Sequence, residues 1–179
     1  NLGLHAGLCD SFSPHLYLKE GGPHSYSSLL NWWKSETPKN VHLWPGLNTV
    51  GVKNVADKVE EISNQIKITR NILGNYSGVI HYSVDGISKN YAMQTALQNL
   101  YKEKALVPAS PWIKSEPVLK PEITAKKSGN NAEIHWLSRN PQQAKHFILF
   151  SKYGNKWETE ILNGDEHTKF LPLVKSGVH

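Results

Sequence analysis

The chain has 179 residues, enough for one or two domains with a hydrophobic core. Hydrophobic residues make up 39% and charged residues 20%, which is typical of globular proteins and argues against a disordered chain. The 20 lysines and arginines outnumber the 15 acidic residues but are scattered, so a basic exterior is favoured over a nucleic-acid surface. No apolar run approaches the roughly 18 residues of a membrane helix, so we expect no membrane span.

The first strand-and-helix unit begins near Ser13. The segment SPHLYLKEGG predicts a short strand followed by a glycine-containing loop. Pro23 and Ser25 then open a helix, which Thr37-Pro38 ends because the residue before proline is pushed out of helical geometry.

A second unit follows directly. Its strand is expected at about Val41 to Trp44, after which Pro45-Gly46 should turn the chain. A long helix is predicted over residues 55–73, with Gly74 at the C-cap position. Apolar positions recur at steps of three and four and form one stripe for burial: Val59, Ile62, Ile66, Thr69 and Leu73.

The third unit has a strand from Gly78 to Tyr82, a turn at Asp85-Gly86 and a further helix. Strands that alternate with helices predict a parallel sheet with its ligand site at the carboxyl ends of the strands. Those ends are where we look for function: Tyr17, Lys19, Glu20, Trp44, Asn48, His81, Tyr82, Ser83 and Asp85. The inward side of the fourth helix is expected at Ala92, Ala96, Leu97 and Leu100.

The second half of the chain has a different rhythm. Residues 107–121 contain four prolines and no helical period, which is typical of a linker. Five short strand patterns with polar turns follow and predict a small β-sandwich with Trp136 in its core. We therefore divide the chain into an α/β domain, 1–113, and an all-β domain, 114–179, and regard the sandwich as incomplete because about seven strands are usual.

Several short motifs keep the order and spacing of a known family over about a hundred residues. The first 113 residues resemble the C-terminal portion of a bacterial family of glycosyl-hydrolase-like TIM-barrel proteins with a domain of unknown function. The matching motifs are Gly7-Leu8-Cys9-Asp10, Pro14-His15-Leu16-Tyr17, Trp32-Trp33, Pro45-Gly46-Leu47-Asn48, Glu61-Ile62, Gln65, Arg70, Gly78, His81-Tyr82-Ser83, Ala105-Leu106-Val107-Pro108 and Trp112. His15 and Leu18 stand where the family tends to have Gln and Trp, so the sugar-contacting surface would differ.

The resemblance implies a partial fold. The three units would be the last three of the eight in a TIM barrel, and members of the family often carry a fibronectin-type-III-like domain after the barrel. Three units leave two sheet edges and the inner face unpaired. We therefore expect either a piece of a longer enzyme or self-association through the open barrel edge, with a large apolar surface on the isolated chain.

The resemblance also implies glycosidic bond cleavage by carboxylate acid/base catalysis. Glu20 and Asp85 are the candidate catalytic residues, although the principal acid and nucleophile could lie on the missing strands. Glu20 could instead pair with a surface lysine, and Asp85 could make only an Asp-Gly turn. The proposed sugar-contacting residues, which could equally serve packing or loop hydrogen bonds, are Tyr17, Trp44, Asn48, His81, Tyr82 and Ser83.

Other readings stay open. The chain could be a non-catalytic carbohydrate-binding or cell-envelope attachment module, or a purely structural interaction domain. We expect no cofactor, because no nucleotide-binding or serine-hydrolase motif is present. We also expect no metal, because the histidines lack ligand spacing: His5, His15, His24, His42 and His81. The resemblance implies secretion or a place in the cell envelope, with any export signal upstream.

Overall fold

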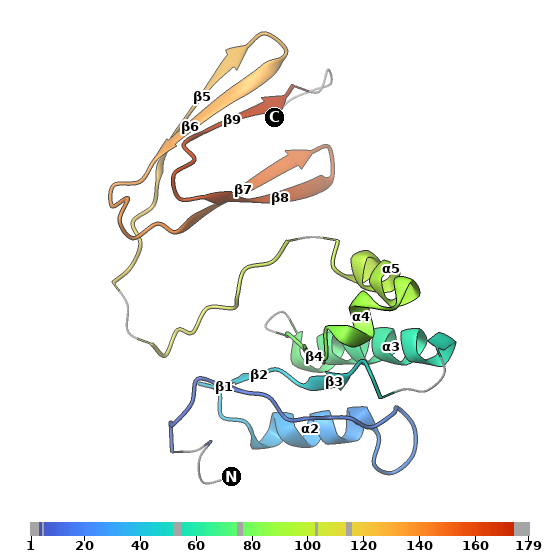
Figure 1. Cartoon of the computed structure of the whole chain (residues 1–179). Helices are drawn as coiled ribbons and strands as arrows, with labels where there is room; N and C mark the ends of the chain where they lie inside the picture. Colours follow the sequence, from blue (N-terminus) through green and yellow to red (C-terminus); the bar gives the residue numbers. More distant parts are fainter. Residues whose placement is uncertain are drawn as a thin grey trace. The chain divides into compact units, whose positions relative to one another are not determined.

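The computed structural model describes residues 4, 6–51, 55–74, 77–102, 104–113 and 116–173, and the side chains of 55–57 are not described. The chain divides into two compact units (Figure 1). The α/β unit comprises residues 1–102 and 107–113, and the β unit comprises residues 103–106 and 114–179. Mixed strands and helices in the first unit and small antiparallel sheets in the second agree with the expected class. No barrel is closed within the described residues.

Three parallel segments form the sheet of the α/β unit. Strand β1 (Ser11–Phe12) pairs with β2 (His42–Leu43), and β3 (Gly46–Asn48) pairs with β4 (Ile80–Tyr82), both in parallel. A further parallel bridge joins His15 to Gly46, so the segment that carries β2 and β3 is central. The prediction that the three segments are neighbours and run in the same direction is confirmed.

The second strand does not end where the sequence predicted. The chain does not turn at Pro45-Gly46 but continues as β3 to Asn48. The Pro45 carbonyl accepts a hydrogen bond from the Ile80 amide (3.0 Å), while the Gly46 amide donates to the Pro14 carbonyl (2.8 Å). Proline has no N–H to donate to a neighbouring strand. It is tolerated at position 45 because its nitrogen faces β4, and β4 begins only at Ile80.

The first strand also lies earlier than expected. Paired residues are Ser11 and Phe12, and beyond Leu16 the chain leaves the sheet. The long helix draws this later segment away, because Gln65 donates to the Leu18 carbonyl (2.9 Å). The stretch after Leu16 is therefore a loop between the sheet and the next helix.

The helices follow the sequence signals closely. They are α2 (Tyr26–Glu36), α3 (Val55–Leu73), the short α4 (Asp85–Ser88) and α5 (Tyr91–Leu100). The Ser25 hydroxyl caps α2 by accepting from the Ser28 amide, and Thr37 is its C-cap residue. Gly74 follows α3 with φ of +73°, the left-handed conformation that favours glycine after a helix. The Asp85-Gly86 turn is the start of α4, whose Gly86 packs so closely on Thr49 that an added Cβ would lie 2.4 Å from the Thr49 carbonyl oxygen.

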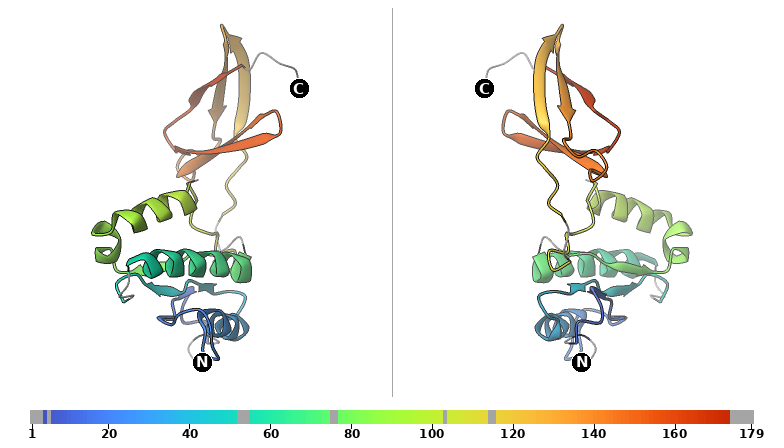
Figure 2. Two further views of the ribbon diagram at one scale, coloured as in Figure 1. Left: turned by 90° about the vertical axis from the view of Figure 1, so that its right-hand side faces the viewer. Right: turned by 90° about the vertical axis from the view of Figure 1, so that its left-hand side faces the viewer.

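One face of the sheet meets the helices. Leu43 and Leu47 point to the same face because side chains alternate along a strand. They share a buried cluster with residues of α2, α3 and α5: Leu16, Tyr26, Leu30, Leu43, Leu47, Ile62, Ile66, Met93 and Leu97. The expected α3 stripe is confirmed, whereas Ala92 of α5 is exposed and Met93 takes the buried position. Figure 2 shows α2, α3 and the sheet from two further sides.

The β unit consists of hairpins. Strands β5 (Glu122–Ser128), β6 (Asn131–Leu137) and β9 (Thr168–Pro172) form one antiparallel sheet, and β7 (His146–Tyr153) and β8 (Lys156–Asn163) form another. The five predicted strands are confirmed. Trp136 is 5% exposed and its ring lies edge-on to Phe147 at 5.9 Å between centroids, so it packs between the two sheets as expected.

Candidate functional site

The face of the parallel sheet that points away from the helix-packed core carries a set of aromatic side chains, which we call the aromatic face. Strand alternation directs them to this side, opposite Leu43 and Leu47. Cross-strand contacts confirm the grouping, because a Cβ on Gly46 would touch the His15 ring and one on Gly78 would touch the Trp44 ring. The aromatic face consists of His15, Tyr17, His42, Trp44 and Tyr82.

Two of the predicted strand-end residues meet on this face. The rings of Tyr17 and Tyr82 lie 5.7 Å apart between centroids, and His15 stacks on Tyr17 at 5.0 Å. Partial burial raises the pKa of the Tyr17 hydroxyl, and the neighbouring Tyr82 raises it further, so the Tyr17 hydroxyl is a neutral hydrogen-bonding group near pH 7. Tyr82 remains 55% exposed and is open to a ligand.

Trp44 lies on the same face, nearer the amino end of the sheet than Tyr82. It is not a strand-end residue, since the chain continues through Pro45 into β3. Its ring stacks on His42 at 5.3 Å, and its buried indole N–H has no hydrogen-bond partner among the described residues. An unpaired buried donor is uncommon and marks a place where a polar partner would be stabilising.

The carboxylate of Glu20 is engaged in local structure. Its two oxygens accept hydrogen bonds from the amide and the hydroxyl of Ser27, at 2.9 and 2.6 Å, in the first turn of α2. An acidic group there is stabilised by the free amides and dipole of the helix N-terminus. The Glu20 amide in turn donates to Glu61 of α3 (2.8 Å). Glu20 therefore joins the loop after the first strand to two helices.

The other polar strand-end residues serve the loops around them. Asp85 forms an exposed ion pair with Lys89 one turn along (2.9 Å). The Asn48 side chain accepts from the Gly51 amide (2.6 Å). The Ser83 carbonyl accepts from the hydroxyl of Thr49 (3.0 Å), and the peptide bond between Tyr82 and Ser83 is cis.

His81 points to the opposite face from Tyr82. It pairs in register with Leu47, on the helix-packed side, and its Nε2 atom lies 3.5 Å from the Tyr101 hydroxyl. Burial lowers the pKa of the His81 imidazole, which favours the neutral ring. Its position separates it from the aromatic face, so the structure does not gather all the predicted sugar-contacting residues in one place.

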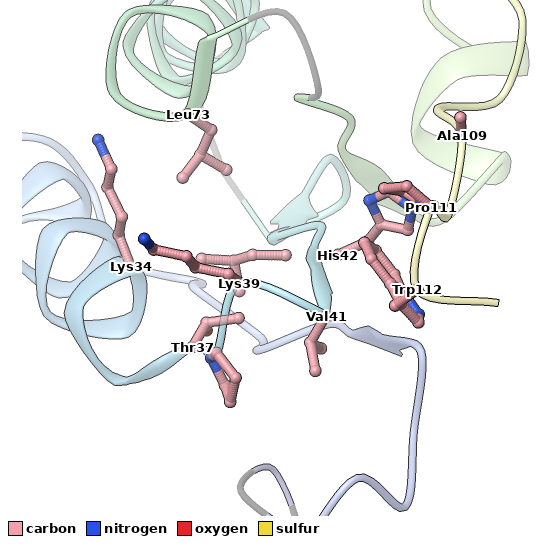
Figure 3. A pocket seen from close by; sticks show the side chains of 11 residues that line it. Lys34, Thr37, Lys39, Val41, His42, Leu73, Ala109, Pro111 and Trp112 are labelled. Carbon is pink, nitrogen blue, oxygen red and sulfur yellow. The ribbon is translucent and has the colours of Figure 1, made fainter.

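A pocket that the sequence did not indicate lies at the amino end of the sheet (Figure 3). Its cavity volume is about 550 Å³. One wall is formed by residues 107–113, which the sequence assigned to a linker. The lining residues are Lys34, Thr37, Pro38, Lys39, Val41, His42, Leu43, Leu73, Ala109, Pro111 and Trp112.

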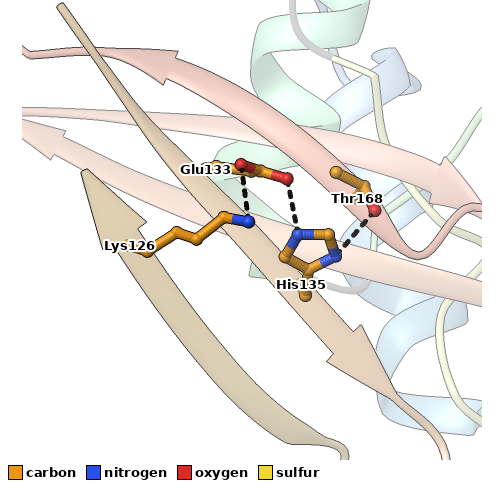
Figure 4. A network of polar contacts seen from close by, with 4 residues as sticks. All are labelled: Lys126, Glu133, His135 and Thr168. Carbon is orange, nitrogen blue, oxygen red and sulfur yellow. Dashed lines mark hydrogen bonds and ion pairs between the residues drawn. The ribbon is translucent and has the colours of Figure 1, made fainter. Parts of the chain in front are cut away.

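A network of polar side chains lies across β5, β6 and β9 of the β unit (Figure 4). His135 Nε2 contacts the Glu133 carboxylate at 2.7 Å, and its Nδ1 lies 3.0 Å from the Thr168 hydroxyl. Lys126 completes an ion pair with Glu133 at 3.2 Å. The hydrogen bond from His135 lowers the pKa of Glu133 against a smaller opposing effect of desolvation, and Lys126 lowers it further. The network therefore cross-links the three strands.

Across the described ranges, no group of three or more His, Cys, Asp or Glu side chains gathers to hold a metal ion, and His5 lies outside those ranges. Among the helices that the structure describes, none is long and apolar enough to cross a lipid bilayer.

Comparison with known proteins adds no assignment. The sequence matches no protein-family model and no curated protein, and the fold matches no solved structure.

Proposed function

We propose that the α/β unit is part of a glycoside-hydrolase-like barrel and that its aromatic face binds a glycan. The apolar face of a sugar ring packs on aromatic side chains, while tyrosine hydroxyls bond to sugar hydroxyls. The observation that carries the proposal is the pair of Tyr17 and Tyr82, with rings 5.7 Å apart on the open side of a parallel sheet. Ligands of barrel enzymes lie near the carboxyl ends of the strands, where these two residues are.

The finer fold belongs to the same proposal. Helices pack on one face of the parallel sheet, as the outer helices of a barrel do. Further strand-and-helix units would complete the barrel, and the β unit would be a fibronectin-type-III-like domain. Action on extracellular or envelope glycans would place the protein outside the cytoplasm.

Catalysis by this chain would require a carboxylate that reaches a bound sugar. Glu20 and Asp85 are the proposed candidates. The hydrogen bonds between Glu20 and Ser27 and the ion pair between Asp85 and Lys89 favour a structural role for both carboxylates. The second candidate function is therefore a non-catalytic glycan-binding module, favoured by these contacts. Both functions share the aromatic face and differ in whether a bond is cleaved.

Glycan-array binding by the intact chain tests the shared part. We expect at least one glycan to bind, and Tyr82→Ala to weaken that binding by about fivefold, in line with the loss of one aromatic contact worth about 1 kcal/mol. Tyr91→Ala is the matched control, because Tyr91 is 83% exposed on α5 and lies outside the aromatic face. Failure of every glycan to bind would refute both candidate functions.

Release of reducing ends from the bound glycan then separates the two functions. A hydrolase would release sugar, and Glu20→Gln would abolish release while keeping an acceptor oxygen for the Ser27 amide. Lys89→Met, which removes the ion-pair partner of Asp85, would leave release within about twofold because surface ion pairs contribute little. Binding without release would support the non-catalytic module.

A further inference from the structure

We propose that the pocket at the amino end of the parallel sheet binds a small carboxylic acid with an apolar body. This site lies at the opposite end of the sheet from Tyr17 and Tyr82, and His42 is the one residue of the aromatic face that lines it. Its volume of about 550 Å³ falls within the roughly 300–1,000 Å³ of known small-molecule sites. The proposal does not depend on glycan binding.

The walls of the pocket are fixed by hydrogen bonds within the α/β unit. The indole of Trp112 donates to the Asp10 carboxylate at 2.8 Å, and His42 Nε2 lies 3.1 Å from the Ser110 hydroxyl. The Trp112 ring also contacts the His42 ring at 4.7 Å. These contacts hold residues 107–113 against the sheet, so the cavity has a defined second wall.

Most of the lining is apolar. Aliphatic and proline side chains come from the loop after α2, the end of α3 and the 107–113 segment, with one indole beside them: Pro38, Val41, Leu43, Leu73, Ala109, Pro111 and Trp112. Such a lining favours a hydrocarbon or aromatic body, because transfer of apolar surface out of water is stabilising. A sugar would place most of its hydroxyls against these apolar side chains.

The charged groups in the lining are both cationic. Lys34 and Lys39 line the pocket, and no acidic side chain does. Lys34 Nζ donates to the Ile72 carbonyl at the end of α3, which leaves two of its three N–H donors for a ligand. Lys39 makes no hydrogen bond or ion pair with another described residue. Figure 3 shows both amino groups on the side of the cavity opposite Trp112.

The carboxyl ends of α2 and α3 lie near this site, and their partial negative charge disfavours a bound anion. The carboxyl ends of α2 and α3 each present about half a negative charge. Lys34 donates a hydrogen bond to the Ile72 carbonyl, and the Thr37 amide and hydroxyl both donate to the Trp33 carbonyl. These hydrogen bonds reduce the negative potential of the two helix ends. Two full lysine charges outweigh these partial charges, and a carboxylate is favoured over a neutral or cationic head.

Titration calorimetry with two probes of equal shape tests the proposal. 2-Naphthoate carries the carboxylate, and 2-naphthamide is its neutral counterpart. We expect naphthoate to bind with a dissociation constant on the order of 1 mM or tighter, and about fivefold more tightly than the amide. Added salt should reduce this ratio, because screening weakens only the charged pair.

Two variants locate the binding. Lys39→Met should weaken naphthoate binding and reduce its advantage over the amide, with Lys34 as the remaining cation, and should leave amide binding unchanged. The control Lys67→Met, on the exposed side of α3, should change neither affinity. Ala109→Trp should fill the cavity and weaken both probes at least tenfold, provided that its melting temperature stays within a few degrees of the parent. Equal binding of the two probes, or an unchanged ratio in Lys39→Met, would overturn the proposal, as would no detectable binding of naphthoate.

Discussion

The two faces of the parallel sheet are built from alternate residues of the same strands, yet they have opposite characters. On the helix-packed face Leu47 is 0% exposed, whereas on the other face Ile80 and Tyr82 are 47% and 55% exposed. Burial explains the residues of the first face, because large aliphatic side chains there fill the core. Burial does not explain the exposed aromatic residues of the second face, which is why we place glycan binding there.

The largest expected effect comes from a cavity on the helix-packed face. Leu47→Ala should lower the free energy of unfolding by about 3 kcal/mol, since it removes a fully buried side chain from between the sheet and the helices. Urea denaturation followed by circular dichroism measures the change. Leu8→Ala is the matched control, because Leu8 is largely exposed and should cost less than about 0.5 kcal/mol. Equal losses in the two variants would contradict the assigned core.

A smaller effect on the same face depends on pH. Burial lowers the pKa of His81 in the folded protein, so the unfolded chain binds the proton first as pH falls. Stability from this group is therefore complete above the ordinary imidazole pKa of about 6.5 and is lost as pH falls from there towards the lowered value. The slope stays below the one-proton limit of about 1.4 kcal/mol per pH unit.

Urea unfolding of the parent and of His81→Gln between pH 7.5 and 4.5 measures this dependence. The variant should show a flatter profile below about pH 6.5. Parallel profiles would show that His81 is protonated equally in both states.

The smallest expected effect is on the open face. Ile80→Thr keeps the β-branched shape and should change the free energy of unfolding by less than about 0.5 kcal/mol, because half of the side chain already meets solvent. Thermal denaturation of the purified chain is sufficient to measure it. A loss above about 1 kcal/mol would mean that this face is covered in solution, as self-association through the open sheet would require.

The sequence was sufficient wherever a local pattern determined the structure. Helix α3 was predicted at residues 55–73 because its period holds over five turns and Gly74 follows it. The hairpins of the β unit were predicted because alternation is interrupted by Gly-Asn turns, in which Gly129 and Gly154 have positive φ. Trp136 was placed correctly for the same reason.

Prediction failed where distant residues decided the outcome. Proline ordinarily ends a strand, and only the late start of β4 allows Pro45 to stay in one. Glu20 was identified as a strand-end carboxylate, but the Gly21-Gly22 loop returns the chain so that Ser27 binds it. The proline-rich 107–113 segment resembled a linker, because no local sequence pattern predicts the hydrogen bond between Trp112 and Asp10.

The hydrogen bond between Asp10 and Trp112 spans 102 positions of the chain. During synthesis Asp10 therefore leaves the ribosome long before its partner, and the sheet and its helices can form while the indole is still absent. Long-range contacts of this kind form late, after the local elements are in place. A compound that fits behind Trp112 would thus recognise only chains whose α/β unit is finished, and would report on maturation as well as on binding.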